Sequence, residues 1–163
     1  METKRLLLRG WNDSDLEAFS DICGRNEVMQ YIDGPWDIER VAEFIRIEQE
    51  QLQKVMHCRW ALELKTSGQL IGFCGLRPLA DDDHQLEIGW RLHPDYWRQG
   101  LAFEAASHVI GQAILDLYPT RIFAKVHVQN EASLALARKL GMQITSRIPV
   151  AEFDDFILDY PIV

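Results

Sequence analysis

The stretch that decides the fold reads Leu86-Glu-Ile-Gly-Trp-Arg-Leu92, followed by His93-Pro-Asp-Tyr-Trp-Arg-Gln-Gly-Leu-Ala102. In its first part apolar residues alternate with polar residues or glycine, which is the period of a strand with two different faces. Its second part is a loop that opens onto apolar residues at helical spacing as far as Leu117. Because a further alternating run, Ile122 to Val128, follows that helix, we predict a parallel strand–helix–strand crossover, with a ligand most expected at its loop.

Further elements flank this crossover on both sides. Before it we predict a strand at Arg5–Arg9, a helix that starts from a capping box at Ser14–Glu17, a longer helix over Ile38–Met56 and a strand hairpin. The longer helix has a charged side that we expect to be solvated. After the crossover come a helix over Asn130–Leu140 and two strands. The order predicts a mixed α/β (α+β) fold, with about four helices on a central, mostly antiparallel sheet.

Length and composition narrow the function classes. The chain has 163 residues and a formal net charge of −8, and no repeat or linker divides it, so we expect one domain over residues 1–163. The acidic balance argues against nucleic acid or an anionic membrane surface as a partner. No apolar stretch approaches the roughly 20 residues of a membrane helix. The cysteines lack metal-ligand spacing, so we expect free thiols in a reducing cytoplasm. They are Cys23, Cys58 and Cys74.

The loop before the long helix carries Arg98, Gln99 and Gly100 at the helix entry. Backbone N–H groups at a helix start have no partner inside the helix, and they lie at the positive end of its dipole. Gly100 lets the chain approach an oxygen closely, and Arg98 adds a positive charge, so the loop suits a pyrophosphate. The alternative is a tight turn at Gly100 beside a solvated Arg98.

Four blocks, in order, make the chain similar to a known family: Thr3–Arg9, Leu86–Leu92, Tyr96–Ala105 and Asn130–Gly141. The chain resembles the GNAT superfamily of CoA-dependent N-acetyltransferases, and within it the branch of the ribosomal-protein alanine N-acetyltransferases. The likeness covers nearly the whole length. It implies the GNAT fold, acetyl-CoA as cosubstrate without a metal, and as acceptor an amine of a small molecule or a protein.

The resemblance also assigns binding residues. The backbone amides of 98–102 would hold the CoA pyrophosphate, although Trp97 stands where the family usually has Gln or Arg. The backbone of 90–92 would pair with the pantetheine arm, whose two amides can add to an exposed strand edge. Asn130 would contact the same arm, or serve only as a helix N-cap. The cofactor-binding residues so implied are Trp90, Arg91, Leu92, Arg98, Gln99, Gly100, Leu101, Ala102 and Asn130.

Transfer to an amine calls for a general base, and Glu87 is the first candidate. It lies on the predicted central strand opposite the apolar face, from which it can project into a cleft. The alternative for Glu87 is a strand carboxylate paired with a neighbouring cation. Glu152, Asp154 and Asp155, near the final strand, are competing bases.

Ser133 is the candidate acid that would protonate the departing thiolate. Many members of the resembled superfamily use a Tyr here, but Ala137 holds that position in this chain. Ser133 lies on the same face of the predicted helix, and members of the resembled branch carry a Ser there with a proposed acid role. No cysteine has a placed His partner, so we expect direct transfer rather than a covalent enzyme intermediate.

The acceptor and the partners stay open at this stage. Trp11, Tyr31 and Trp36 would line the acceptor cleft in the resembled family, or be core aromatics. Acidic residues at Asp81–Asp83 and near the C-terminus could surround a cationic amine, or be solvated. The rival function is a non-catalytic acyl-CoA-binding sensor or interaction module; a nucleotide-binding module lacks GxGxxG and GxxxxGK[ST]. An edge strand near the C-terminus would support a homodimer.

Overall fold

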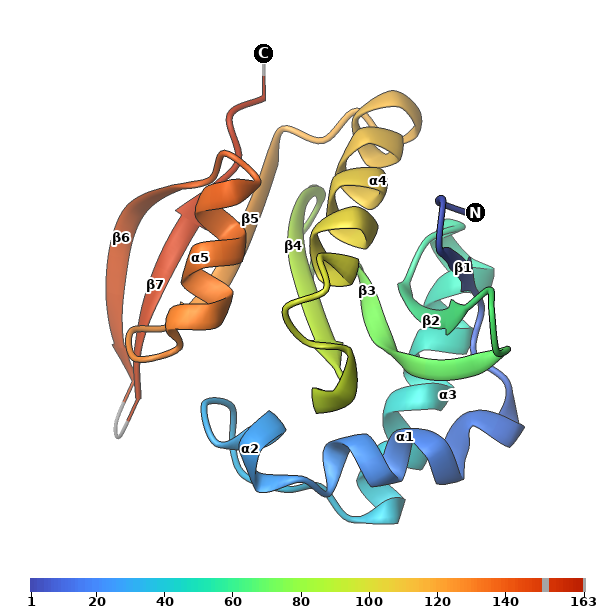
Figure 1. Cartoon of the computed structure of the whole chain (residues 1–163). Coiled ribbons are helices and arrows are strands. Elements are labelled where there is room, and N and C mark those ends of the chain that lie inside the picture. Colours follow the sequence, from blue (N-terminus) through green and yellow to red (C-terminus); the bar gives the residue numbers. More distant parts are fainter. Residues whose placement is uncertain (151–152, 163) are drawn as a thin grey trace.

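The structure, a computed structural model, describes residues 1–150 and 153–162 and is built on one seven-stranded sheet (Figure 1). Its strands are β1 (Leu6–Arg9), β2 (Arg59–Leu64), β3 (Gln69–Leu79), β4 (Asp82–Leu92), β5 (Arg121–His127), β6 (Gln143–Val150) and β7 (Phe153–Asp159). Their order across the sheet is β1-β2-β3-β4-β5-β7-β6. All neighbours are antiparallel except β4 and β5, which are parallel. The mixed, mostly antiparallel sheet and its parallel crossover are confirmed.

Helices cover both faces of the sheet. They are α1 (Leu16–Cys23), α2 (Asn26–Met29), α3 (Ile38–Val55), α4 (Leu101–Asp116) and α5 (Glu131–Lys139). The sequence predicted about four helices, and the described residues form five. The additional one, α2, is a single turn, and four residues are too few to show a helical period. In Figure 1, α4 and α5 lie on one face and α1 and α3 on the other.

Two apolar cores fill the space between these layers. Leu86, Ile88 and Leu92 of β4 point toward α4 and α5, as the alternation predicts. The opposite core is aromatic and lies between the sheet, α1 and α3. Trp11 belongs to it: the residue is 4% exposed, and its indole donates to the Arg59 carbonyl at 2.6 Å. Trp11 is therefore a core aromatic.

The charged side of α3 is exposed, as predicted, but one carboxylate, Glu48, lies on the buried stripe of the helix with Val41 and Ile45. Glu48 is fully buried, and its carboxylate accepts from the backbone N–H and from Nε of Arg59, each at 2.7 Å. The Arg59 guanidinium also lies over the Phe44 ring, 4.5 Å from its centroid. This buried ion pair ties α3 to β2.

Two turns differ from the prediction. The helix entry begins before the predicted capping box, at a short turn over Asp13–Asp15, where Asp15 Oδ2 accepts from the Asn12 N–H at 2.9 Å. Asp81–Asp83 predict a turn between β3 and β4, but the turn is tighter, because Asp82 already lies in β4 and accepts from the His84 N–H at 2.9 Å. In both places a local side-chain hydrogen bond sets the boundary.

The three cysteines are free and buried, as expected. Burial raises the pKa of each of their thiols, so they stay protonated. No helix in the described part of the chain is long and apolar enough to span a bilayer. Within residues 1–150 and 153–162, no three His, Cys, Asp or Glu side chains group as metal ligands would.

Candidate active site

The parallel strands β4 and β5 separate after a short common stretch. They pair only from Gln85 opposite Arg121 to Glu87 opposite Phe123. Beyond this point β4 continues against β3 as far as Leu92, while β5 continues against β7 (Figure 1). Among the described residues, β4 therefore has a free backbone edge from Ile88 onward.

Hydrogen bonds at the two ends of β4 show which backbone groups face this edge. The carbonyl of His84 points toward β5, because it accepts a hydrogen bond from the Thr120 N–H at 2.9 Å. The N–H of His93 points toward β3, because it donates to the Ile71 carbonyl at 2.8 Å. Because backbone groups point to alternate sides along a strand, even-numbered residues face the free edge. Odd-numbered residues face β3.

This alternation shows which of the three residues predicted to hold the pantetheine arm direct their backbone groups to the free edge. The backbones of Trp90 and Leu92 face the free edge, as the prediction requires. The Leu92 carbonyl is taken, because it accepts from the Trp97 indole at 2.8 Å. Arg91 is different: its backbone pairs with Phe73 of β3, so it is not available to an added strand.

The loop that precedes α4 is exposed from Trp97 to Gly100, and Leu101 then enters the core. Gly100 is the N-cap residue with φ +76°, and Arg98 also has a positive φ, +58°. A Cβ at Gly100 would meet only the Arg5 guanidinium, at 3.6 Å, so the left-handed backbone rather than crowding requires glycine. The first amides of α4 thus face an exposed loop, and a pyrophosphate cradle at 98–102 stays a prediction.

Two residues that the sequence did not single out brace this loop. Arg5 donates to the Gln99 carbonyl at 2.8 Å, and its Nε donates to Glu104 Oε2 at 2.7 Å. Partial burial would raise the pKa of Glu104, but hydrogen bonds from Thr3 and Arg5 hold that pKa below its ordinary value. Arg5 and Glu104 both lie in blocks that carry the family resemblance, and that resemblance is the feature of the sequence that could have identified them.

The side chains of Trp90, on β4, and Ser133, on α5, are in contact. The Trp90 indole donates to Ser133 Oγ at 3.2 Å, and the Ser133 N–H donates to Asn130 Oδ1 at 3.1 Å. Asn130 is therefore the N-cap of α5, and its contact with the pantetheine arm stays a prediction. Because Ser133 Oγ accepts from the indole, its own O–H is left to donate.

Glu87 lies on the opposite face of the sheet, where the β4–β5 pairing ends. Its carboxylate is 3.5 Å from the Arg77 guanidinium and 3.7 Å from Lys125 Nζ. The neighbouring cations of the structural alternative are thus present. Of the competing bases, Asp154 pairs with Arg147, Asp155 lies opposite His127 in the β5–β7 pairing, and Glu152 lies outside the described residues.

The segment between α2 and α3, residues 30–37, contacts both separated strands. Tyr31 stacks on His127 of β5, with ring centroids 5.3 Å apart. Trp36 lies against the guanidinium of Arg91 of β4, 4.3 Å from its ring centroid. Two of the three aromatics considered for the acceptor cleft therefore contact side chains of the separated strands.

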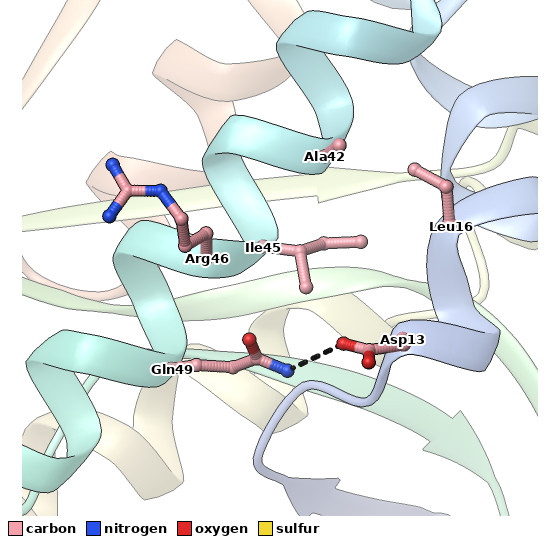
Figure 2. Close-up of a pocket in the computed structure, with 6 residues that line it drawn as sticks. All are labelled: Asp13, Leu16, Ala42, Ile45, Arg46 and Gln49. Carbon is pink, nitrogen blue, oxygen red and sulfur yellow. Dashed lines mark hydrogen bonds between the residues drawn. The ribbon is translucent and has the colours of Figure 1, made fainter.

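Figure 2 shows a different hollow, between the start of α1 and α3. Its volume is about 260 Å³, and Gln49 Nε2 donates to Asp13 Oδ1 across it at 3.3 Å. Its lining residues are Asp13, Leu16, Ala42, Ile45, Arg46 and Gln49. None of them belongs to the separated strands or the loop, so this hollow is not part of the candidate site.

Comparison with known proteins agrees with this geometry. An uncharacterised N-acetyltransferase of Bacillus subtilis (strain 168), YoaA, is 34% identical over 145 residues, which are 88% of this chain and 82% of that protein. A GNAT-family acetyltransferase from Bacillus anthracis superposes with a TM-score of 0.86 at 24% identity, covering 98% and 96% of the two chains. Spermidine N-acetyltransferase from Vibrio cholerae, solved with CoA and spermine, gives 0.78 at 17% identity, covering 96% and 95%.

The family model described as an acetyltransferase (GNAT) domain matches residues 5–143. That span takes in the bracing residues, the separated strands, the loop before α4 and the start of β6. The chain therefore belongs to the GNAT acetyltransferase family.

Proposed function

We propose that this chain is an acetyl-CoA-dependent N-acetyltransferase that moves the acetyl group directly to a primary amine of a protein N-terminus, a lysine or a small molecule. The observation that carries the proposal is the free edge of β4 leading to the glycine-started helix α4. A molecule with a peptide-like arm and a pyrophosphate finds strand pairing and helix N–H groups in one continuous path.

Different residues of this chain would bind different parts of that molecule. The amides at 98–102 would hold the pyrophosphate, and Trp90 with the Leu92 N–H would pair with the arm. CoA supplies the thioester chemistry when bound. The buried cysteine thiols stay protonated, so we assign no covalent enzyme intermediate.

Glu87 and Ser133 would move the protons. Glu87 accepts a proton from the acceptor ammonium, directly or through a water. The nitrogen then forms a bond to the acetyl carbon while the carbon–sulfur bond breaks, and the nitrogen gives up its second proton. Ser133 donates a proton to the departing thiolate and takes up this second proton, directly or through a water, so the products are the amide, the CoA thiol and the one proton that Glu87 releases.

The test combines CoA titration by calorimetry with a thiol-release assay on a panel of amines. The panel includes a peptide N-terminus, lysine and spermidine, because the narrower likeness to the ribosomal-protein alanine branch is itself a prediction. We expect CoA binding and release above background with at least one class. Tight CoA binding without release for any amine would favour the non-catalytic acyl-CoA sensor.

We expect Gly100→Val to raise the Kd for CoA at least about tenfold. Valine is strained at φ +76°, at a cost of about 1–3 kcal/mol, and its side chain would project at the start of α4. Calorimetry measures the effect, and Gly111→Ala, an exposed α4 position with open space around it, is the matched control. An unchanged Kd in a folded Gly100→Val protein would mean that the pyrophosphate binds elsewhere.

We expect Ser133→Ala to lower kcat by less than about tenfold. A thiol with a pKa near 8.5 leaves adequately without strong acid assistance, so the hydroxyl makes a small contribution. Steady-state kinetics at saturating acetyl-CoA measure this change, and Ser133→Thr, which keeps a hydroxyl, should recover part of it. A fall of a hundredfold or more would assign Ser133 a larger role than the one proposed.

A further inference from the structure

Arg91 is a deeply buried arginine without a carboxylate. It is 8% exposed, and among the described residues its guanidinium makes one hydrogen bond, from Nη1 to the Cys23 Sγ at 3.1 Å. Its Nε is buried and has no partner. A guanidinium has five N–H donors, and a sulfur is a weak acceptor. Most of the hydrogen-bonding capacity of this side chain is therefore unused.

Two other arginines of the sheet are paired with carboxylates. Arg59 pairs with the buried Glu48, and Arg9 pairs with both Asp15 and Glu63. Arg91 is more buried than either, yet the described residues place no Asp or Glu within ion-pair distance of it. Burial of an unpaired charge is costly. The missing counter-ion thus calls for an explanation.

Neighbouring groups compensate the charge only in part. The guanidinium lies over the rings of Trp36 and Phe73, at 4.3 Å and 5.4 Å from their centroids. Ring faces attract a cation but leave its N–H edges unsatisfied. Cys23 cannot serve as a counter-ion, because burial raises the pKa of its thiol. Among the described residues, no hydrogen-bond acceptor pairs with the edge formed by Nε and Nη2, of which Nε is buried.

The position of Arg91 relates this edge to the proposed reaction. Glu87, Gly89 and Arg91 lie on one face of β4, and residues two apart on a strand are separated by about 7 Å. Gly89 has no side chain, and the Phe73 ring and the Arg59 side chain pack against it, 3.5 Å and 4.0 Å from where a Cβ would stand. Trp36, which covers Arg91, belongs to the segment that contacts both separated strands.

We propose that Arg91 binds an oxyanion, a carboxylate or a phosphate, of the acceptor. The preferred acceptor is then an amine that carries such a group a few atoms from its nitrogen. The free guanidinium edge presents two parallel N–H donors, which match two oxygens of one oxyanion. Because Nε is shielded, Trp36 and its segment must shift as the acceptor enters. The inference rests on the proposed function and names its substrate class.

The wild-type protein tests this with pairs of amines in which only one member carries an anionic group. One arm compares γ-aminobutyrate with its methyl ester, and the other compares O-phosphoethanolamine with ethanolamine. We expect kcat/KM for the anionic member to exceed that of its partner at least about 30-fold in one arm, and the arm that responds identifies carboxylate or phosphate. Turnover without this preference in either arm would overturn the inference alone. No turnover with any amine, including spermidine and peptides, would overturn the proposed function and this inference with it.

Two arginines that flank the same ring provide a matched variant test. Arg91→Met fills the buried volume without charge, and Arg40→Met removes an exposed guanidinium that lies 4.6 Å from the Trp36 ring centroid and pairs with Asp33. We expect Arg91→Met to raise KM at least about 30-fold for the anionic amine only, with partial recovery in Arg91→Lys. Arg40→Met should leave KM unchanged.

A binding measurement separates recognition from a structural role. The acetylated anionic product is titrated into the CoA-saturated protein by calorimetry, with melting temperature and CoA affinity as folding checks. Weaker product binding with unchanged CoA affinity in Arg91→Met supports the proposal. Equal losses for charged and uncharged members, or loss of CoA affinity as well, would make Arg91 a structural residue. If Arg91→Met does not fold, the wild-type pairs still decide.

Discussion

Replacing Glu87 with Gln is expected to lower kcat/KM for amine acetylation by about 10²- to 10⁴-fold. Glutamine keeps the size of the side chain but cannot accept the ammonium proton. Glu87 lies where β4 and β5 separate, on the face that Arg91 and the segment 30–37 share. Steady-state kinetics and CoA calorimetry on the same preparation measure the change. The CoA affinity should stay the same, since its proposed contacts are backbone groups beyond Glu87.

Glu63→Gln is the matched control for this change. Glu63 is also a strand carboxylate paired with an arginine, and its side chain is 24% exposed against 21% for Glu87. If both variants lose little activity, Glu87 is the structural carboxylate that its contacts with Arg77 and Lys125 also allow. In that case Asp155→Asn is the next variant, because Asp155 lies opposite His127, on which Tyr31 stacks.

Replacing Glu48 with Ala is expected to destabilise the fold by about 3–5 kcal/mol and to lower the melting temperature by roughly 6–20 °C. Glu48 is fully buried and accepts three hydrogen bonds from Arg59. Its removal leaves a guanidinium and a backbone N–H without acceptors in a low-dielectric site. Urea titration and thermal unfolding measure the loss.

Glu43 on the same helix provides the comparison. It pairs with Arg46 at the surface, where side-chain entropy and solvent cancel most of the attraction, so Glu43→Ala should leave the melting temperature unchanged. The double change Glu48→Leu with Arg59→Met removes both charges together and should recover much of the lost stability. Equal effects of Glu48→Ala and Glu43→Ala would contradict a buried ion pair.

Much of the fold followed from periodicity in the sequence. The apolar spacing of α4 and the alternation in β4 survive in the structure because each pattern matches the face that is buried. The helix α2 was missed because a single turn has no period. The burial of Glu48 was missed because a carboxylate on an amphipathic helix normally faces solvent, and only the arrival of Arg59 from β2 overrides that preference.

The candidate site was predicted less completely. The loop at Gly100 is local in sequence, so its helix-start chemistry could be read from the residues themselves. The hydrogen bond between Trp90 and Ser133 joins residues far apart in the chain, and it depends on how α5 packs against the sheet. Arg91 was assigned through its backbone, whereas its buried side chain is the unusual feature. Side-chain burial without a counter-ion is a tertiary property that no spacing rule reports.

The short pairing between β4 and β5 leaves the sheet as two half-sheets, one of four strands and one of three. Within the described residues, strand pairing joins the two half-sheets only where Gln85–Glu87 lie opposite Arg121–Phe123. The unliganded protein thus depends on the core shared with α4 and α5 to keep the halves aligned. A molecule lodged in the separation, bonded to one half and touching the other, would act as a cross-link between them.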